Sequence, residues 1–399
     1  MDSLTQIVLG AAVGEVVLGK KVGNRALLWG AVGGTIPDLD VVTSIFLDPL
    51  QTLAAHRGFS HSIVFAVLGA FLFGWLIHRL YQSPFHKYLA MLGWFMIPVG
   101  VVYFISRIFD NASFSIVSGS IMTVILIGAF IVLYKKYFKS ESRELPDATL
   151  KDWQWLMFWA VFTHPLLDCF TTYGTQLFQP FSDYRVAFNT IAVADPFYTL
   201  PFLICIISIF FHHRKTEKRR RLAWIGMTIS SVYMMLCVFN KSRVNTVWQN
   251  TLKSSDVKYS RYMTSPSILS NFLWTCVAET DEGFVTGQYS VFDKEPKVLF
   301  EKILRNQTGK NLPLDDHTFE RMRWFSNNFY SIIEHPQGLQ FNDLRFGGSR
   351  TKDGDRHYIF NFILKEEGDS YRMIGSNGGP PPGEEQEMIS NLWTRIKGI

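Results

Sequence analysis

Long apolar runs occupy the first 240 residues of the chain, and shorter alternating patterns follow them. A helix of about 20 mainly apolar residues spans a bilayer core of roughly 30 Å. Five stretches meet this requirement: 62–78, 88–106, 114–134, 194–211 and 222–239. Three further apolar stretches are interrupted by glycine, proline, histidine or acidic residues, as in short, broken or re-entrant helices: 4–19, 26–47 and 153–172. We therefore predict a mainly α, polytopic membrane domain with about seven or eight membrane segments.

The pattern changes near residue 243 to short stretches of alternating apolar and polar residues. Such alternation, with turn residues between the runs, is typical of β-strands. Strands are predicted at 273–278, 284–292 and 357–364, and amphipathic helices at 317–334 and 385–397. We therefore expect two domains, a transmembrane helical domain over 1–240 and a soluble α+β domain over 241–399.

Charge adds an orientation to this picture. The net charge of +5 is concentrated in short basic loops between apolar runs, which indicates membrane orientation and not nucleic-acid binding. Four such loops fall on one side of the predicted topology: 20–25, 78–87, 135–143 and 214–221. If that side is the cytoplasm, the C-terminal domain lies on the outer side. The four cysteines lack CxxC spacing, so we expect neither a disulfide framework nor a zinc knuckle.

Ionisable side chains inside membrane segments are costly and usually mark function. His56 and His61 are five residues apart, which on a continuous helix would separate them by roughly 140°. A loop turning at Gly58 would bring both imidazoles to one point, with Ser60 or Ser62 capping the next helix. The segment from His56 to Ser62 is therefore a candidate metal-binding loop.

A second pair of candidates lies further along the chain. His164 and Asp168 are four residues apart and share a helical face, so both can reach one ion. Pro165 either kinks this helix or begins a new one, and both alternatives keep the pair together. We predict that His164 and Asp168 are metal ligands.

Acidic residues complete the candidate set. Asp38 and Asp40 follow Pro37, and on a helix they would point in nearly opposite directions. We assign Asp40 as a metal ligand and Asp38 as a ligand or general base, although both could also end a helix and bind nothing. Asp195 precedes Pro196 and is either a further ligand or a helix cap.

The topology derived from the basic loops puts these residues in or near the outer half of the bilayer, so separate segments converge on one layer. A mixed imidazole and carboxylate set suits Zn²⁺, with Mn²⁺ or Fe as alternatives. Such an ion lowers the pKa of a bound water and polarises an ester or phosphoryl oxygen. Arg57, a charged planar fork, is the candidate for holding an anionic substrate group.

At these residues the sequence resembles a known family. The turn Asp38-Leu39-Asp40, the string His56-Arg57-Gly58-Phe59-Ser60-His61-Ser62 and the pair His164 and Asp168 are similar to those of the YdjM family of bacterial inner-membrane proteins. The resemblance covers about residues 1–210 and implies a membrane-bound, metal-dependent hydrolase in the cytoplasmic membrane. Many relatives have a histidine before the first apolar run, where this chain has Thr5-Gln6. That difference leaves the number of ligands open.

The main functional hypothesis is hydrolysis of a lipid or lipid-linked ester or phosphoester, because a site at bilayer level favours membrane substrates. The histidines and aspartates would hold the ion, with Asp38 and Arg57 as catalytic residues. One alternative is a transporter or channel that uses the same cluster as a proton or ion relay. Another is an envelope interaction protein, in which the metal is structural and the C-terminal domain, whose protein partners the sequence does not identify, does the binding.

Overall fold

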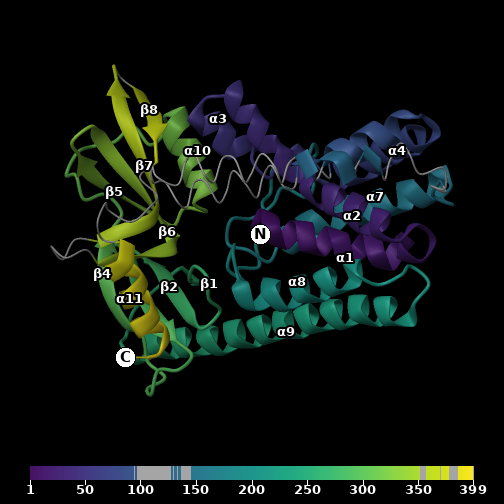
Figure 1. Cartoon of the computed structure of the whole chain (residues 1–399). Helices are drawn as coiled ribbons and strands as arrows, with labels where there is room; N and C mark the ends of the chain where they lie inside the picture. Colours follow the sequence, from purple (N-terminus) through teal and green to yellow (C-terminus); the bar gives the residue numbers. More distant parts are fainter. Residues whose placement is uncertain are drawn as a thin grey trace, which may run out of the picture. The chain divides into compact units, whose positions relative to one another are not determined.

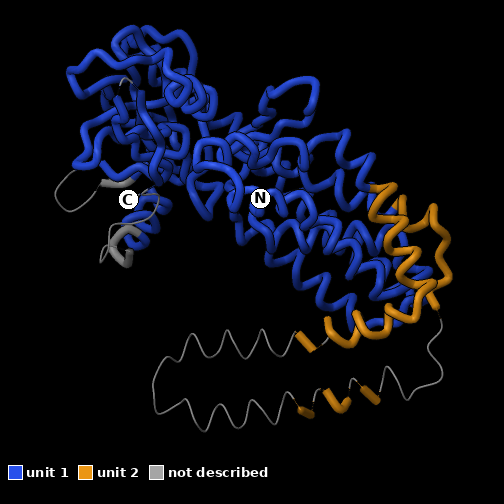
Figure 2. Tube along the Cα trace, turned by 90° about the horizontal axis from the view of Figure 1, so that it is seen from above, with its two compact units in different colours: residues 1–69, 156–399 blue, residues 70–155 orange. Residues whose placement is uncertain are grey.

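The computed structural model describes residues 1–93, 95–96, 127–128, 130–132, 134–135, 145–350, 356–368, 370–376 and 385–398. It divides into two compact units, one formed by residues 1–69 and 156–399 and the other by residues 70–155 (Figure 2). All candidate site residues belong to the first unit. The predicted membrane segments 88–106 and 114–134 lie mostly outside the described residues.

The N-terminal region is helical, as predicted. Its described elements are α1 (Ser3–Val22), α2 (Asn24–Thr35), the 3₁₀ helix η1 (Pro37–Ile45), α3 (Pro49–Ala55), the 3₁₀ helix η2 (Phe59–His61), α4 (Ile63–Gln82), α7 (Leu150–Asp168), α8 (Pro196–Phe210) and α9 (Glu217–Ser254). Among the described residues, α1, α4 and α9 are long and apolar enough to cross a membrane, and α8 is a shorter apolar helix. The predicted stretch 26–47 is broken into α2 and η1, where Pro37 opens the second element.

Helices α1 and α2 pack backbone against backbone through glycines spaced four residues apart. A Cβ atom added at Gly10 would lie 2.3 Å from the carbonyl oxygen of Gly30, and one added at Gly14 would lie 2.1 Å from that of Ala26. Gly34 is equally close to α1. Small residues of this kind allow the close helix approach that is common in membrane proteins. The contact fixes the end of α2 beside the beginning of α1.

A buried ion pair ties the opposite end of α1 to α9. Arg219 donates from Nε and Nη2 to the two carboxylate oxygens of Glu15, at 2.7 and 2.6 Å. Its Nη1 donates to Asn24 Oδ1 at 2.6 Å. A bidentate pair with its remaining donors satisfied is the arrangement that makes a buried arginine tolerable. Glu15 is thus occupied at the end of α1 that is away from the candidate site.

The C-terminal region contains two antiparallel sheets with the orders β1-β2-β3-β4 and β5-β6-β7-β8. The strands are β1 (Arg261–Pro266), β2 (Leu273–Thr280), β3 (Gly283–Ser290), β4 (Leu299–Leu304), β5 (Tyr330–His335), β6 (Gly338–Arg350), β7 (Arg356–Glu367) and β8 (Ser370–Gly375). Strands β2, β3 and β7 and the last helix, α11 (Glu385–Ile396), agree with the sequence predictions. Figure 1 shows both sheets with their helices.

The helix predicted at 317–334 is shorter than expected. Helix α10 covers only His317–Phe325, and strand β5 begins at Tyr330. Asn327 and Asn328 between them have φ values of 50° and 58°, a left-handed conformation that asparagine tolerates and that ends a helix. The apolar residues that follow pair with β6 and do not continue the helix.

Helix α9 connects the two regions without a break. Its 38 residues extend about 57 Å, which is more than a bilayer core of about 30 Å requires. Beyond the apolar part, Val244, Val247, Trp248 and Leu252 pack against the first sheet in one buried cluster. The boundary that we expected at residue 240 therefore falls inside a continuous helix, because no glycine or proline interrupts the sequence there.

Candidate metal centre

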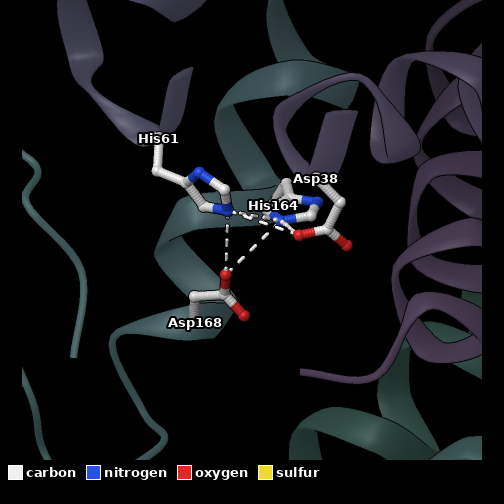
Figure 3. A group of neighbouring side chains, drawn as sticks. All are labelled: Asp38, His61, His164 and Asp168. Atoms are coloured by element: carbon white, nitrogen blue, oxygen red, sulfur yellow. Dashed lines mark hydrogen bonds and ion pairs between the residues drawn. The ribbon is translucent and has the colours of Figure 1, made fainter. Parts of the chain in front are cut away.

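Four ionisable side chains from three segments converge at one point (Figure 3). Asp38 lies at the start of η1, His61 ends η2, and His164 and Asp168 lie at the end of α7. Each offers one ligand atom, and these four atoms all lie within 4.8 Å of one another. We refer to Asp38, His61, His164 and Asp168 as the Asp/His cluster.

The spacing of the four ligand atoms in the Asp/His cluster matches a single small ion. His61 Nε2 and His164 Nε2 are 3.1 Å apart. Asp38 Oδ1 lies 3.5 Å from the first of these nitrogens and 3.3 Å from the second. Asp168 Oδ2 lies 3.4 and 3.3 Å from the same two nitrogens. Four ligands placed tetrahedrally at about 2.0–2.1 Å from zinc would be separated by about 3.3 Å, and these five separations lie close to that value. The sixth, between Asp38 Oδ1 and Asp168 Oδ2, is within 4.8 Å.

Burial gives a second reason to expect a cation. His61, His164 and Asp168 are buried, and the Oδ2 atom of Asp168 has no hydrogen-bond donor among the described residues. A buried carboxylate oxygen without a donor is costly unless a charge compensates it. The side chain of Asp38 is the exposed member, at 21%. The cluster therefore fits a divalent cation that is reached from the side of Asp38.

Both histidines are oriented by the nitrogen that faces away from the cluster. His164 Nδ1 lies 2.6 Å from the carbonyl oxygen of Gly34, at the end of α2, where helix carbonyls lack helical partners. His61 Nδ1 lies 3.0 Å from Ser60 Oγ, and Ser60 donates in turn to Asp40 Oδ2 at 3.2 Å. With Nδ1 protonated in both rings, each Nε2 presents its lone pair to the cluster, as in most histidine metal sites.

Asp40 lies behind the Asp/His cluster and organises the loop that carries His61. Its Oδ1 accepts from His56 Nδ1 at 2.9 Å, and its Oδ2 accepts from the backbone N–H of Arg57 at 2.9 Å. Its Oδ2 also lies 3.4 Å from His61 Nδ1. In the structure, Asp38 offers a ligand atom to the cluster, whereas Asp40, which we predicted as a ligand, contacts His61 and the loop that carries it. Neither Asp40 nor His56 is a member of the cluster.

The loop turns one residue earlier than expected. Arg57, and not Gly58, adopts the left-handed conformation, with φ 57°. Gly58 is required for space, because a Cβ atom there would lie 2.7 Å from the carbonyl oxygen of Ala55. Ser62 Oγ accepts from the backbone N–H of Phe65 at 3.0 Å and so caps α4, as one of our two alternatives predicted. This turn leaves His56 on one side of Asp40 and His61 on the other.

The pair on α7 is held in one continuous helix. α7 runs through Pro165 and ends at Asp168, so the proline does not begin a new helix. His164 Nε2 and Asp168 Oδ2 meet at 3.3 Å, which is the contact that spacing by four residues predicts. Of the two alternatives for Pro165, a single helix containing the proline is the one observed.

Arg57 is buried against Asp168 and does not face an open space. Its Nη2 lies 3.4 Å from Asp168 Oδ1, and its Nη1 donates to Thr171 Oγ1 at 2.8 Å. The α-amino group of Met1 and the side chain of Gln6 reach the same oxygen, with Gln6 Nε2 at 3.0 Å. Asp168 therefore has one oxygen surrounded by donors and one left for the cluster.

Gln6 and Met1 are contacts that the sequence did not assign to the site. Gln6 is buried, and its Nε2 also donates to the carbonyl oxygen of His164 at 3.3 Å. The only signal was a polar residue at the start of an apolar stretch, which we interpreted as a missing ligand. The structure instead shows a hydrogen-bond donor that holds a cluster carboxylate.

Asp195 lies outside the Asp/His cluster and caps a helix. Its Oδ1 accepts from the backbone N–H of Phe197 at 3.0 Å, at the start of α8. Tyr233 on α9 donates to its Oδ2 at 2.9 Å. Of the two readings of Asp195, the cap is therefore the one observed, since proline at the next position fixes the first turn.

The C-terminal domain reaches the site through alternating arginine and aromatic side chains. The guanidinium carbons of Arg57 and Arg185 lie 4.8 and 4.7 Å from the centroid of the Tyr173 ring. Arg185 and Arg345 lie 4.7 and 5.1 Å from that of Phe325. We call these five residues the cation–π ladder. Each such contact contributes about 0.5–2 kcal/mol, so the series joins Arg57 to α10 and β6.

Hydrogen bonds reinforce this connection. Arg185 Nη1 donates to the carbonyl oxygen of Phe325 at 3.1 Å, and Arg345 Nη1 donates to that of Thr172 at 3.4 Å. Burial raises the pKa of the Tyr173 phenol, which keeps the ring neutral between its two arginines. Tyr173 and Leu50 of α3 belong to the same buried core as α10 and the second sheet. The loop after α7 is therefore part of the C-terminal core.

Comparison with known families adds an independent finding. A family model described as YdjM inner membrane protein matches residues 1–244, which include the whole Asp/His cluster and end within α9. No curated protein and no solved structure matches the chain. The matched region carries the apolar helices α1, α4 and α9. The chain thus belongs to the YdjM family of inner-membrane proteins, and its two-sheet C-terminal domain follows the part that the family model covers.

Proposed function

We propose that the protein is a membrane-bound, metal-dependent hydrolase that acts on a lipid or lipid-linked ester or phosphoester. The main support for this proposal is the convergence of four ligand atoms in the Asp/His cluster, where the two histidine nitrogens lie 3.1 Å apart and each lies 3.3–3.5 Å from both carboxylate oxygens. Two imidazoles and two carboxylates suit Zn²⁺, with Mn²⁺ or Fe as alternatives. A bound ion of this kind supplies Lewis acidity and a water molecule of lowered pKa.

The residues around the cluster have separable roles in this proposal. Asp40, through Ser60, holds the ring of His61, and Gly34 holds that of His164. Arg57 lies 3.4 Å from the outer oxygen of Asp168, so in this proposal it positions that ligand and does not hold the substrate. Asp38, the exposed member, lies where substrate would enter.

His56 is the candidate proton acceptor beside the Asp/His cluster. Its Nδ1 lies 2.9 Å from Asp40 Oδ1 and its side chain is 34% exposed, a fixed and accessible position that suits a general base. The His56 and His61 ring centroids are 6.1 Å apart. Asp38, which we predicted as a ligand or general base, lies near both cluster histidines, so the proposal treats it as a ligand and His56 as the general base.

The proposal includes a multi-pass arrangement with about seven or eight segments in the inner membrane and the C-terminal domain in the periplasm. Contacts between the basic loops support it. Arg214 donates to the carbonyl oxygen of Lys21 at 2.8 Å, and Asn24 donates to that of Phe210 at 3.0 Å. The loop after α1 and the loop after α8 therefore share one end of the helical region, consistent with a common cytoplasmic side.

The depth of the cluster supports a membrane substrate. Gln6, which contacts Asp168, precedes Lys20 by fourteen residues of α1, or about 21 Å of helix. A hydrocarbon core is about 30 Å thick, so a site at this distance from the basic end would lie in the outer half of the bilayer. Substrates with acyl chains partition to that depth of the bilayer, and water-soluble substrates do not.

The test is turnover by purified protein in nanodiscs with a panel of lipid phosphoesters and acyl esters. We expect product release that requires a divalent metal, stops with a chelator and is lost in Asp38→Asn. Asp195→Asn should remain active, because that residue lies outside the cluster, where it caps α8 and accepts from Tyr233. Absence of turnover by metal-loaded protein across the panel would contradict hydrolysis. Ion flux in liposomes that depends on His164 would favour the relay alternative.

A further inference from the structure

Helix η1 has two faces of opposite character. Asp38 and Asp40 point inward to the cluster and to the loop behind it. The large apolar side chains of the same segment are exposed in the part of the chain that the structure describes: Leu39 60%, Val41 61%, Val42 49%, Ile45 74% and Phe46 83%. Exposure of contiguous apolar residues to water is unfavourable and marks a surface that contacts something apolar. The segment that carries a ligand therefore also carries an uncovered apolar surface.

Continuity with α2 indicates what covers this surface. On α2, Leu28 and Val32 are exposed four residues apart, and the exposed apolar residues of η1 follow directly after the end of α2, beginning with Leu39. α2 begins at the basic end of the helical region, where Asn24 contacts α8 and Arg219. In a membrane protein, the outward apolar face of such a helix meets lipid. The exposed apolar side chains of η1 continue this lipid-facing surface along the chain.

The length of α2 sets the depth at which η1 begins. Its 12 residues extend about 18 Å from the basic end, which is less than a hydrocarbon core of about 30 Å. The length of α1 gives a similar depth. Gly34 at the end of α2 lies against Gln6 of α1, and Gln6 is separated from Lys20 at the basic end by about 21 Å of helix. η1 therefore begins inside the apolar layer and not in water.

We propose that η1 contacts the acyl chains of the outer leaflet and forms the lipid side of the entrance to the Asp/His cluster. The entrance is at Asp38, because the other three cluster residues are buried. Leu39 follows Asp38 directly, and Val41 lies one 3₁₀ turn further along η1. A lipid would bring its ester or phosphoester past η1 to Asp38 while its acyl chains remain in the bilayer. This deepens the proposed function, on which it rests, by assigning the route of the substrate.

The test is the accessibility of spin labels in protein reconstituted in liposomes. The four native cysteines are free and buried, so single introduced cysteines can be labelled selectively. Labels are placed at Val42→Cys and Ile45→Cys on η1, with Phe46→Cys as a further position. Met235→Cys on the apolar part of α9, 67% exposed, is the lipid reference. Lys302→Cys on β4, 79% exposed, is the water reference.

Collisions with oxygen, which partitions into lipid, are compared with collisions with a water-soluble nickel chelate. We expect the η1 labels to favour oxygen to within about two-fold of the Met235→Cys label, because both sites would lie within the hydrocarbon layer. Labels that behave like Lys302→Cys would overturn the proposal. Labels shielded from both reagents would also overturn it, since protein from this chain or a second copy would then cover η1.

Metal content measured on the same samples separates this proposal from the proposed function. Lipid-exposed labels on a protein without metal would leave the lipid contact standing and remove the hydrolase. Water-exposed labels on a protein with metal would leave the metal site standing and remove the entrance.

Discussion

At the scale of single residues, the Asp/His cluster depends on side chains that do not provide its ligand atoms. Gly34 and the pair Ser60 and Asp40 fix the two histidine rings, and Gln6 and Arg57 occupy the outer oxygen of Asp168. Such contacts set the tautomer and direction of a ligand before the ion arrives. Their removal should weaken metal binding without removing a ligand.

Asp40→Asn tests this statement. The amide cannot accept from His56, Arg57 N–H and Ser60 in the same way, so the loop carrying His61 loses its anchor. We expect metal affinity to fall by about 10–100-fold, measured by competition with a chromophoric chelator. Asp48→Asn is the control, because Asp48 caps α3 and asparagine caps as well. Equal affinities for the Asp40→Asn variant and the parent protein would show that Asp40 has no supporting role.

Some residues of the site could be predicted from the sequence and others could not. Spacing by four residues identified His164 and Asp168, and the loop that we expected at Gly58 identified His61. The choice between Asp38 and Asp40 depended on which face of η1 meets α7. That contact is formed by residues more than 100 positions apart, so local spacing could not decide it. His56, which we also predicted as a ligand, lies outside the cluster for a similar reason, since the left-handed Arg57 directs it to Asp40.

At the scale of elements, the glycine contact between α1 and α2 positions two sides of the site. Gln6 lies near the start of α1, and Asp38 follows the end of α2. The close approach of these helices has no spare volume at Gly14. A side chain there must separate the helices and shift both residues.

Gly14→Val is therefore expected to destabilise the protein by about 1–3 kcal/mol or more through overpacking, and to lower metal content as Gln6 and Asp38 move apart. Thermal unfolding in detergent and metal analysis measure the two effects. Gly93→Ala is the control, since a Cβ atom there meets nothing within 4 Å in the part of the chain that the structure describes. An unchanged melting temperature in Gly14→Val would contradict the packing described here.

Elements were easier to predict than their ends. The strands β2, β3 and β7 followed from alternation, and α11 followed from its amphipathic pattern. Helix α10 ended early because two asparagines took left-handed backbone conformations, which sequence permits but does not demand. The stretch 26–47 was recognised as interrupted, but its division into an α-helix and a 3₁₀ helix depended on tertiary packing.

At the scale of the whole molecule, the C-terminal domain is connected to the metal centre. The cation–π ladder runs from Arg57 to Arg345, and the loop after α7 shares a core with α10. The family match ends in α9, so these contacts join a family site to a domain beyond the matched region. We expect that domain to stabilise the loop that holds Arg57 beside Asp168.

Phe325→Leu should test the connection, because it keeps an apolar side chain but removes the ring between Arg185 and Arg345. We expect faster amide hydrogen exchange in residues 169–190 and a several-fold lower metal affinity, since the ladder contacts are worth about 0.5–2 kcal/mol each. Phe319→Leu is the matched control: it is equally buried in α10 and the same core. If both variants change the loop equally, general loosening of the core explains the effect and the ladder does not.

The central claim is that the Asp/His cluster binds a metal ion, and the most direct measurement is the metal content of protein purified in detergent. We expect about one divalent ion per chain in the parent protein, because the four ligand atoms gather at one point and four ligands suffice for one zinc ion. His61→Ala and Asp168→Asn should lose it, while Asp195→Asn should retain it. A parent protein that folds but contains no stoichiometric metal, and takes none up on titration, would contradict the account.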